Sequence, residues 1–336
     1  MIPVLRAHRR LALLAAGSLL SVVAAWLAIR DVSLAQTFGL VVAIDVRWLV
    51  VAFTALGLQV SIRSLRWSTL LPANAHGRRI PVRRVLPVTL IGYLGNAVLP
   101  ARLGEPLRAA LIAAREGIAV SETLGSVVLE RALDTLALAG LGVVFALLLA
   151  APDWVLSVAI IGALVSSSAL VAIVAAAFTT RGRSADVLPR QVARLARQVH
   201  RVLHGARIAE RPVVIGATIG LSLGAWALDA ALFWFAARSI GVELSPADAV
   251  LVSVVAVLST VVPSAPGYVG TFHLAAAAAA GALGVPPAPA LAMAVVAHSL
   301  TVVPLALGGA ASAVALGIDG TVRAGRAPTA MGGAPQ

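Results

Sequence analysis

The sequence predicts an all-α, polytopic membrane protein with six full spans, two re-entrant broken hairpins and an inverted internal repeat. Hydrophobic residues make up 60% of the 336 residues, and charged residues only 12%. Mean hydropathy is +0.97, and apolar runs recur at the length of a membrane helix. Soluble domains carry about 25% charged residues. The bilayer is therefore expected to solvate much of the surface, and no part is large or polar enough for a separate soluble enzyme domain.

Six apolar stretches are long enough to cross the hydrocarbon core, which takes about 20 helical residues. The first follows Arg6, Arg9 and Arg10 and resembles the start of a signal peptide. It is longer than a usual signal core and further spans follow it, so we expect an uncleaved span. The predicted spans are 11–29, 48–71, 123–149, 154–178, 213–237 and 288–316.

Two further apolar runs, Val85–Leu99 and Ala249–Val262, are too short to cross. Each ends in a break rich in Pro and Gly and is followed by a second short helix. We therefore expect 85–116 to enter and leave the membrane on the cytoplasmic side, and 249–285 to enter and leave it on the outer side. Broken backbone at membrane depth is tolerated only inside protein or beside a wet cavity. The predicted breaks are Pro100, Gly104, Pro263, Pro266, Gly267 and Gly270.

The basic residues predict the orientation. The net charge is +12, and every Lys or Arg position is an Arg. These residues lie mainly in short loops between apolar runs, which is the pattern of cytoplasmic loops in membrane proteins. The same distribution disfavours a nucleic-acid partner. The N-terminus, the 78–84 loop, the basic 181–211 segment and the C-terminus are expected in the cytoplasm of a bacterium. One transmembrane domain, 1–320, and a disordered cytoplasmic tail, 321–336, are predicted.

Similar residues recur at an offset of 166. Pro-Ala-Arg-Leu-Gly at 100–104 aligns with Pro-Gly-Tyr-Val-Gly at 266–270, and Arg63 falls opposite Asp229. The order of span, broken hairpin and span is also repeated, over about 48–150 and 213–316. By the charge count the two units have opposite orientations. Inverted repeats with broken helices are typical of secondary transporters.

The charged residues in apolar segments have two interpretations. Arg63 and Arg66 either snorkel to the interface beside Trp67 or bind a lipid phosphate. In the first break, Glu105 and Arg108 are spaced to pair on one helix. This stretch is either the structural tip of a hairpin whose charges neutralise one another, or a site where Arg102 or Arg108 binds an anionic head group.

Glu130, Arg131 and Asp134 lie inside an otherwise apolar span, where an unpaired charge costs several kcal/mol. Arg131 is the expected counter-ion, with Arg63 or Arg102 completing the cluster, and its role is structural or functional. His273 and His298 are either satisfied polar side chains or a proton-coupling pair. Neither a metal nor a cofactor is predicted, because the chain has no Cys and no catalytic motif.

The stretch Asn96–Arg108, then Gly117 and Glu130-Arg131-Ala-Leu-Asp134, resembles the first half of the lysylphosphatidylglycerol synthase transmembrane-region (flippase-like domain) family. Pro263–Phe272, with Gly284, resembles its second half, and the resemblance covers roughly 10 to 320. Two features depart from the family. Tyr268 stands where a second Gly is common, while His273 and His298 stand where Glu and Arg are usual.

The resemblance implies a domain that moves lipids between leaflets or helps to move them, without the aminoacyl-transfer domain of the fused members. Our leading hypothesis is a non-enzymatic translocase of an anionic phospholipid or a polyprenyl-phosphate lipid across the inner membrane. The alternatives are a non-transporting accessory subunit, partnered with a glycosyltransferase or another envelope-biosynthesis protein, and a membrane-embedded lipid-modifying enzyme. The predicted head-group residues are Arg63, Arg66, Asn96, Arg102, Glu105, Arg108, Glu130, Arg131, Asp134, Asp229, Tyr268, His273 and His298.

Overall fold

The computed structural model describes residues 2–100, 102–179, 212–262 and 264–317. Within them the regular elements are all helices. The expectations for 181–211, for Pro263 and for the tail 321–336 fall outside the described residues. The elements are α1 (Ile2–Ile29), α2 (Leu34–Val42), α3 (Val46–Leu70), α4 (Val82–Val98), α5 (Gly104–Glu116), α6 (Val120–Leu148), α7 (Asp153–Thr179), α9 (Pro212–Ser239), α10 (Pro246–Ser259), the 3₁₀ turn η3 (Pro266–Tyr268), α11 (Thr271–Ala282) and α12 (Pro287–Ala315).

Several described helices have the length and apolar character of membrane spans. Four qualify singly, within α3, α6, α9 and α12, and α1 with α2 forms a fifth candidate that bends by 89° between its two helices. Shorter apolar helices cover Asp153–Ser168 and Pro246–Ser259. The molecule is therefore an all-α membrane protein. Helix α2, which starts at the Ser33 N-cap, was not predicted from the sequence.

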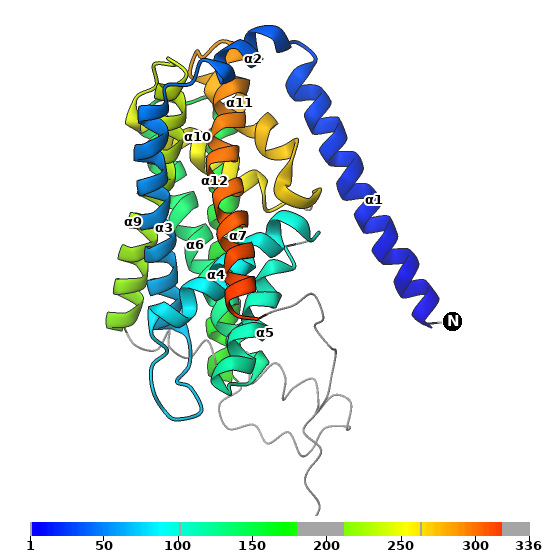
Figure 1. Cartoon of the computed structure of the whole chain (residues 1–336), viewed down its shortest axis with the longest axis vertical. Coiled ribbons are helices and arrows are strands. Elements are labelled where there is room, and N and C mark those ends of the chain that lie inside the picture. The colour runs from blue at the N-terminus through cyan, green and yellow to red at the C-terminus, as the bar shows by residue number, and fades with distance from the viewer. Residues whose placement is uncertain (1, 101, 180–211, 263, 318–336) are drawn as a thin grey trace, which may run out of the picture.

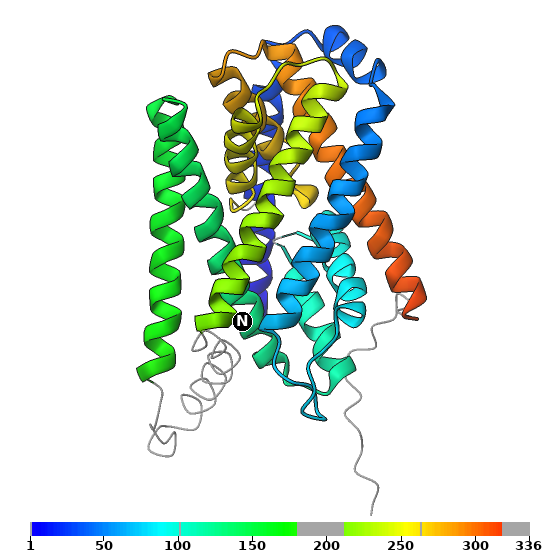
Figure 2. The same ribbon diagram turned by 90° about the vertical axis from the view of Figure 1, so that its left-hand side faces the viewer.

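The helices of the two hairpins divide between the two ends of the bundle (Figures 1 and 2). Helices α4 and α5, the first hairpin, occupy the lower half, and α10 and α11, the second hairpin, occupy the upper half. The long helices α3, α6, α9 and α12 run past both of them. Because α3 packs along α9 and α12 packs along α4, segments far apart in the sequence enclose the centre of the molecule.

Local sequence explains where the helices begin. Asp45 caps α3 by accepting a hydrogen bond from the Arg47 amide at 3.0 Å. Ser245 and Asp248 form a reciprocal capping box at the start of α10. Such caps satisfy amides that have no partner within the helix, so these helices start where the chain turns at the ends of the bundle.

Glycine permits the close approaches at both breaks. A Cβ on Gly104 would lie 1.9 Å from the Gly92 carbonyl oxygen, so α5 crosses α4 backbone to backbone. A Cβ on Gly270, whose φ is +91°, would lie 2.2 Å from the Ser21 carbonyl oxygen of α1. The same Ser21 accepts a hydrogen bond from the Ala265 amide at 2.8 Å. These contacts fix the first turns of α5 and α11.

Candidate functional site

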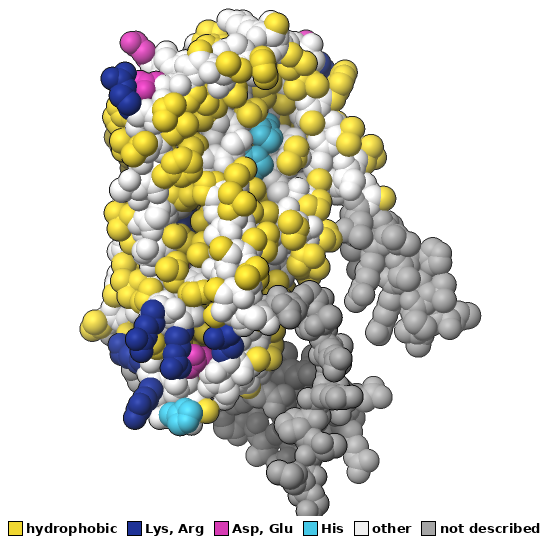
Figure 3. Space-filling view, in the orientation of Figure 1, with side chains coloured by type: hydrophobic (Ala, Val, Ile, Leu, Met, Phe, Trp, Pro, Cys, Tyr) yellow, Lys and Arg dark blue, Asp and Glu magenta, His cyan; other side chains and the backbone are white. Residues whose placement is uncertain are grey.

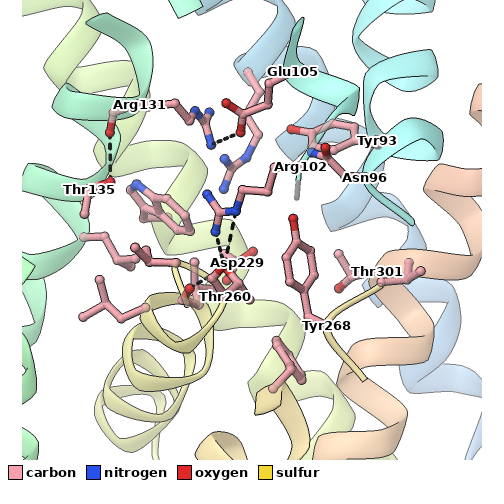
Figure 4. Close-up of a pocket in the computed structure, with 18 of the residues that line it drawn as sticks. Tyr93, Asn96, Arg102, Glu105, Arg131, Thr135, Asp229, Thr260, Tyr268 and Thr301 are labelled. Atoms are coloured by element: carbon pink, nitrogen blue, oxygen red, sulfur yellow. Dashed lines mark hydrogen bonds and ion pairs between the residues drawn. The ribbon is translucent and has the colours of Figure 1, made fainter. Parts of the chain in front are cut away.

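A cavity of about 530 Å³ lies where the two hairpins approach each other. Its walls come from α3, α4, α5, α6, α7, α9, α10, η3, α11 and α12, and Figure 4 shows its polar side chains. Apolar groups such as Val257, Leu258 and Leu305 complete the lining. The charged side chains on the wall are Arg63, Arg102, Glu105, Arg131 and Asp229. This mixture suits a polar group held in an apolar setting.

Arg102 joins the two hairpin breaks. Its Nε donates to the Thr260 carbonyl oxygen at 3.1 Å, and its Nη2 donates to the Thr260 hydroxyl at 2.6 Å. The guanidinium also lies 5.5 Å from the centre of the Tyr268 ring (Figure 4). Arg102 (φ +55°) and Tyr268 (φ +58°) both have left-handed backbone, which is unfavourable for side chains of this kind. Each break thus directs one large polar side chain toward the other.

Arg66 is the centre of a buried ionic cluster behind the cavity. It is 0% exposed, and its guanidinium donates to Glu130, to both carboxylate oxygens of Asp134 and to the Ser222 hydroxyl. Beside it, Trp67 is also 0% exposed and donates to the Ser126 hydroxyl at 3.1 Å. Of the two interpretations of Arg66, the snorkelling one with Trp67 at the interface is therefore wrong, because carboxylates on α6 hold this face of α3 inside the bundle.

The expected pair of Glu105 with Arg108 is also replaced by other contacts. Arg108 lies 4.3 Å from the Trp67 ring centre and donates to Glu130 at 2.7 Å. Glu105 instead lies 3.8 Å from Arg131. The two side chains share a helix, but Arg108 points into the core and Glu105 toward the cavity. Charge partners on α6 therefore prevail over the weak pairing of neighbours on one helix.

Arg131 connects the cluster to the cavity. Its Nη2 donates to Asp134 at 2.8 Å and to Glu130 at 3.1 Å. The predicted counter-ion role of Arg131 thus agrees with the geometry. The side chain is 31% exposed, and it lines the cavity wall. Arg131 is therefore shared between the buried carboxylates and the open space.

Arg63 and Asp229 line the wall opposite. Arg63 lies 4.3 Å from the Trp226 ring centre and 3.5 Å from Asp134. Asp229, only 8% exposed, accepts a hydrogen bond from the Gln59 amide at 2.8 Å. Arg63 is buried in the bundle, so the interpretation that it snorkels to the interface is also wrong. It belongs to the cavity.

His273 and His298 contact each other through their rings. Nε2 of His273 lies 3.2 Å from Nδ1 of His298, and Phe272 stacks on His298 with 4.5 Å between ring centres. The Gly270 amide donates to Nδ1 of His273 at 3.3 Å. His298 lines the cavity and His273 lies behind it. The two residues thus form a pair where the start of α11 packs on the middle of α12.

The structure sorts the predicted residues into two groups. Arg66, Arg108, Glu130, Asp134 and His273 lie behind the cavity. The predicted residues on its wall are Arg63, Asn96, Arg102, Glu105, Arg131, Asp229, Tyr268 and His298. Sequence reasoning missed Gln59, Tyr93, Trp226 and Thr260, which also line it. Gln59 and Trp226 lie one helical turn from Arg63 and Asp229, and that spacing is the signal that would have identified them.

Comparison with known proteins adds the family. The family model described as the lysylphosphatidylglycerol synthase TM region matches residues 14–309. The chain is also 28% identical over 268 residues to a protein of Haloferax volcanii named glycosyltransferase AglD. That match covers 68% of this chain but only 43% of the relative's length. Because the family model spans most of the sequence, the chain belongs to the lysylphosphatidylglycerol synthase TM region family.

Proposed function

We propose that this protein is a lipid translocase that carries an anionic head group, of a phospholipid or a polyprenyl phosphate, across the bacterial inner membrane. The observation that carries the proposal is the cavity between the hairpin breaks. Three arginines, Arg63, Arg102 and Arg131, lie on its wall, and guanidinium groups suit phosphate because they donate two parallel hydrogen bonds. A volume of about 530 Å³ also suits a head group.

Arg102 is the proposed primary phosphate ligand. Within the described residues Arg102 forms no ion pair with a carboxylate. Arg131, by contrast, forms ion pairs with three carboxylates, and Arg63 forms one with Asp134. An incoming phosphate therefore meets its strongest unbalanced charge at Arg102. Glu105, Glu130 and Asp134 hold the other arginines in place and keep the site close to neutral when it is empty.

The proposed topology has six crossings by α1, α3, α6, α7, α9 and α12. The first hairpin enters from the cytoplasm and the second from the outside, which is supported by their positions in opposite halves of the bundle. Basic side chains gather at the lower end, over the α3–α4 loop and the start of α4 (Figure 3). Cytoplasmic loops favour arginine, so both termini would lie in the cytoplasm.

Matching backbone conformations support the proposed inverted repeat. Arg102 and Tyr268, at an offset of 166, both have positive φ. Two residues later, Gly104 and Gly270 each begin a helix at a position where a Cβ would clash. Gly117 (φ +66°) and Gly284 (φ +87°) follow those helices. In this proposal the repeats alternate access to a head-group site at their interface.

Transport would then involve the head group alone. The acyl or polyprenyl chain stays in lipid, while the cavity replaces the water around the phosphate with guanidinium groups. Moving a charge through hydrocarbon without such partners costs several kcal/mol or more. No covalent bond changes in this scheme, so we propose a non-enzymatic role.

Reconstituted protein gives the test. Proteoliposomes should accelerate leaflet exchange of a tail-labelled anionic phospholipid, read as the fraction reduced by an impermeant quencher. Arg102→Ala should lower the rate at least about tenfold, since a charged hydrogen bond contributes roughly 1.5–3 kcal/mol. Arg47→Ala, which removes an exposed arginine far from the cavity, is the matched control. Equal rates in wild type and Arg102→Ala would contradict the proposal.

The second candidate is an accessory subunit of a glycolipid or glycosyltransferase pathway. It is favoured by the similarity to a protein named as a glycosyltransferase, of which this chain matches less than half. This role predicts no lipid exchange by the purified protein and stable co-purification with a glycosyltransferase from native membranes. The exchange assay and the pull-down together separate the two roles.

A further inference from the structure

Unpartnered polar atoms concentrate at the cavity. Among the described residues, seven buried side-chain nitrogen or oxygen atoms have no hydrogen-bond partner within the protein. Five of them belong to residues that line the cavity of about 530 Å³: Asn96, Arg131, Trp226, Asp229 and His298. An unsatisfied buried polar group costs about 1–3 kcal/mol, so this concentration points to a bound molecule that supplies the missing partners.

The hydrogen bonds of the histidine pair determine what His298 offers. The Gly270 amide donates to Nδ1 of His273, so that nitrogen carries no proton and Nε2 of His273 does. Nε2 in turn donates to Nδ1 of His298, which leaves the His298 proton on its own Nε2. That Nε2–H is buried. The Gly267 carbonyl group lies near it, but not in hydrogen-bond geometry, so the Nε2–H has no full partner within the protein. His298 therefore presents a donor to the cavity.

Asp229 presents an acceptor. Its Oδ1 accepts from Gln59, whereas Oδ2 is buried without a partner. Asn96 adds a second unpartnered acceptor, Oδ1. Arg131 Nε and the Trp226 indole nitrogen add donors. A bare phosphate would satisfy the donors but repel Asp229. A hydroxyl group satisfies both kinds of atom, because it donates one hydrogen bond and accepts others.

The charge balance disfavours an ammonium group as the partner of Asp229. Four guanidinium groups of the cavity and its ionic cluster face four carboxylates, and Arg102 is the fifth cation. The carboxylates of Glu105, Glu130 and Asp134 form ion pairs with Arg63, Arg66, Arg108 and Arg131. The fourth carboxylate, Asp229, has no ion pair among the described residues and accepts a hydrogen bond from the neutral Gln59 side chain. One phosphodiester charge neutralises Arg102. A zwitterionic head group would leave one positive charge uncompensated in a medium of low dielectric constant.

We propose that the substrate is a monoanionic phosphodiester lipid whose head group is uncharged and carries hydroxyl groups, such as a glycerol or a sugar. This inference rests on the proposed function and specifies its substrate class. The phosphodiester contacts Arg102, and the hydroxyls contact Asp229 Oδ2, Asn96 Oδ1 and the His298 Nε2–H. Asp229 and His298 are thus specificity-determining residues.

Four lipid probes test the proposal on the full-length purified protein. Phosphatidylglycerol and phosphatidylmethanol with identical tails have the same charge, and only the first carries hydroxyls. Phosphatidylethanolamine replaces the hydroxyls with an ammonium group. A polyprenyl phosphohexose compares a sugar with glycerol. Each probe competes against a tail-labelled phosphatidylglycerol for binding, and each is also assayed for exchange in proteoliposomes.

Phosphatidylglycerol or the phosphohexose should bind at least about tenfold more tightly than phosphatidylmethanol, and the stronger of the two identifies the head group. The preference should fall in Asp229→Leu and in His298→Phe, which keeps the ring stacked on Phe272. His298→Gln retains a hydrogen-bond donor, so it should preserve more of the preference for the hydroxyl-bearing lipid than His298→Phe does. Arg47→Ala should leave it unchanged.

Two results would overturn the inference while leaving the translocase proposal intact. The first is equal binding of phosphatidylglycerol, the phosphohexose and phosphatidylmethanol, with all of them exchanged. The second is tighter binding and faster exchange of phosphatidylethanolamine, which would assign an ammonium group to Asp229. Absence of binding and exchange for every probe would overturn both proposals together. The wild-type ranking decides the question even if a variant fails to fold.

Discussion

At the scale of single residues, the stability of this protein depends on charges that have been removed from water. Arg66 illustrates this because it is fully buried and bonded to two carboxylates and a hydroxyl. A buried ion pair contributes little net stability compared with an apolar replacement of both partners. Removal of one partner is different, since the remaining charge stays buried without compensation.

We therefore predict that Arg66→Met lowers the free energy of unfolding by about 3–5 kcal/mol. Glu130 and Asp134 would lose their shared donor. Arg66→Lys should also destabilise, because an ammonium group cannot reproduce the planar fork of the guanidinium. Thermal unfolding in detergent measures both variants, with the exposed Arg47→Met as control. A midpoint like that of wild type for Arg66→Met would show that Arg66 is not a structural centre.

At the scale of elements, two kinds of contact define the hairpins. The first kind is backbone packing through glycine, at Gly104 in the first hairpin and Gly270 in the second. The second kind is the contact of Arg102 with Thr260, which joins the two breaks. This contact also separates the large cavity from a smaller one of about 130 Å³, since Arg102 and Thr260 line both.

Alanine at Gly104 or Gly270 should reduce the yield of folded protein strongly, because its Cβ would overlap a carbonyl oxygen of a neighbouring helix. Gly57→Ala and Gly140→Ala are matched controls, since nothing lies within 4 Å of either added Cβ. Both should be neutral or stabilising, by up to about 1 kcal/mol for a helix interior. Size-exclusion chromatography and thermal unfolding provide the measurement. Equal behaviour of all four variants would refute the close packing of the breaks.

Thr260→Val should strengthen binding of an anionic lipid. Arg102 must leave the Thr260 hydroxyl to contact a phosphate, and the substitution removes that competing acceptor at nearly constant volume. We expect an increase in affinity of up to about tenfold, in line with the strength of a charged hydrogen bond. Weaker binding in the competition assay would mean instead that Thr260 orients Arg102 for the ligand. Ser61→Ala, at an exposed site on α3, is the control.

At the scale of the whole molecule, the two hairpins lie in opposite halves of the bundle (Figure 2). This arrangement makes a topological prediction that a single assay decides. The natural sequence contains no cysteine, so single cysteines can be introduced without background labelling. Arg83, in the first turn of α4 in the first hairpin, and Glu243, just before α10 of the second, are both exposed.

Arg83→Cys and Glu243→Cys should react with a membrane-impermeant maleimide from opposite faces of the membrane. In intact cells Glu243→Cys should be labelled and Arg83→Cys protected, and lysis should expose both. His76→Cys, in the same α3–α4 loop region as Arg83, should match Arg83→Cys. Labelling of positions 83 and 243 from one face would rule out hairpins that enter from opposite sides.

The sequence alone determined the membrane class, the all-α fold, the positions of most helices other than α2, and the presence of charged residues in apolar helices, because hydropathy and helix termination act over a few residues. The charge partners depended on the fold. Arg108 donates to Glu130 of α6 and not to its neighbour Glu105. Arg66 donates to Glu130 inside the bundle. Arg102 donates to Thr260, which is 158 residues away in the sequence. Those choices follow from which helix faces pack together, as α3 does on α9 and α12 on α4. Ion pairs form between groups that are close in space, and the spacing of two residues along the sequence does not predict how close they are in the fold.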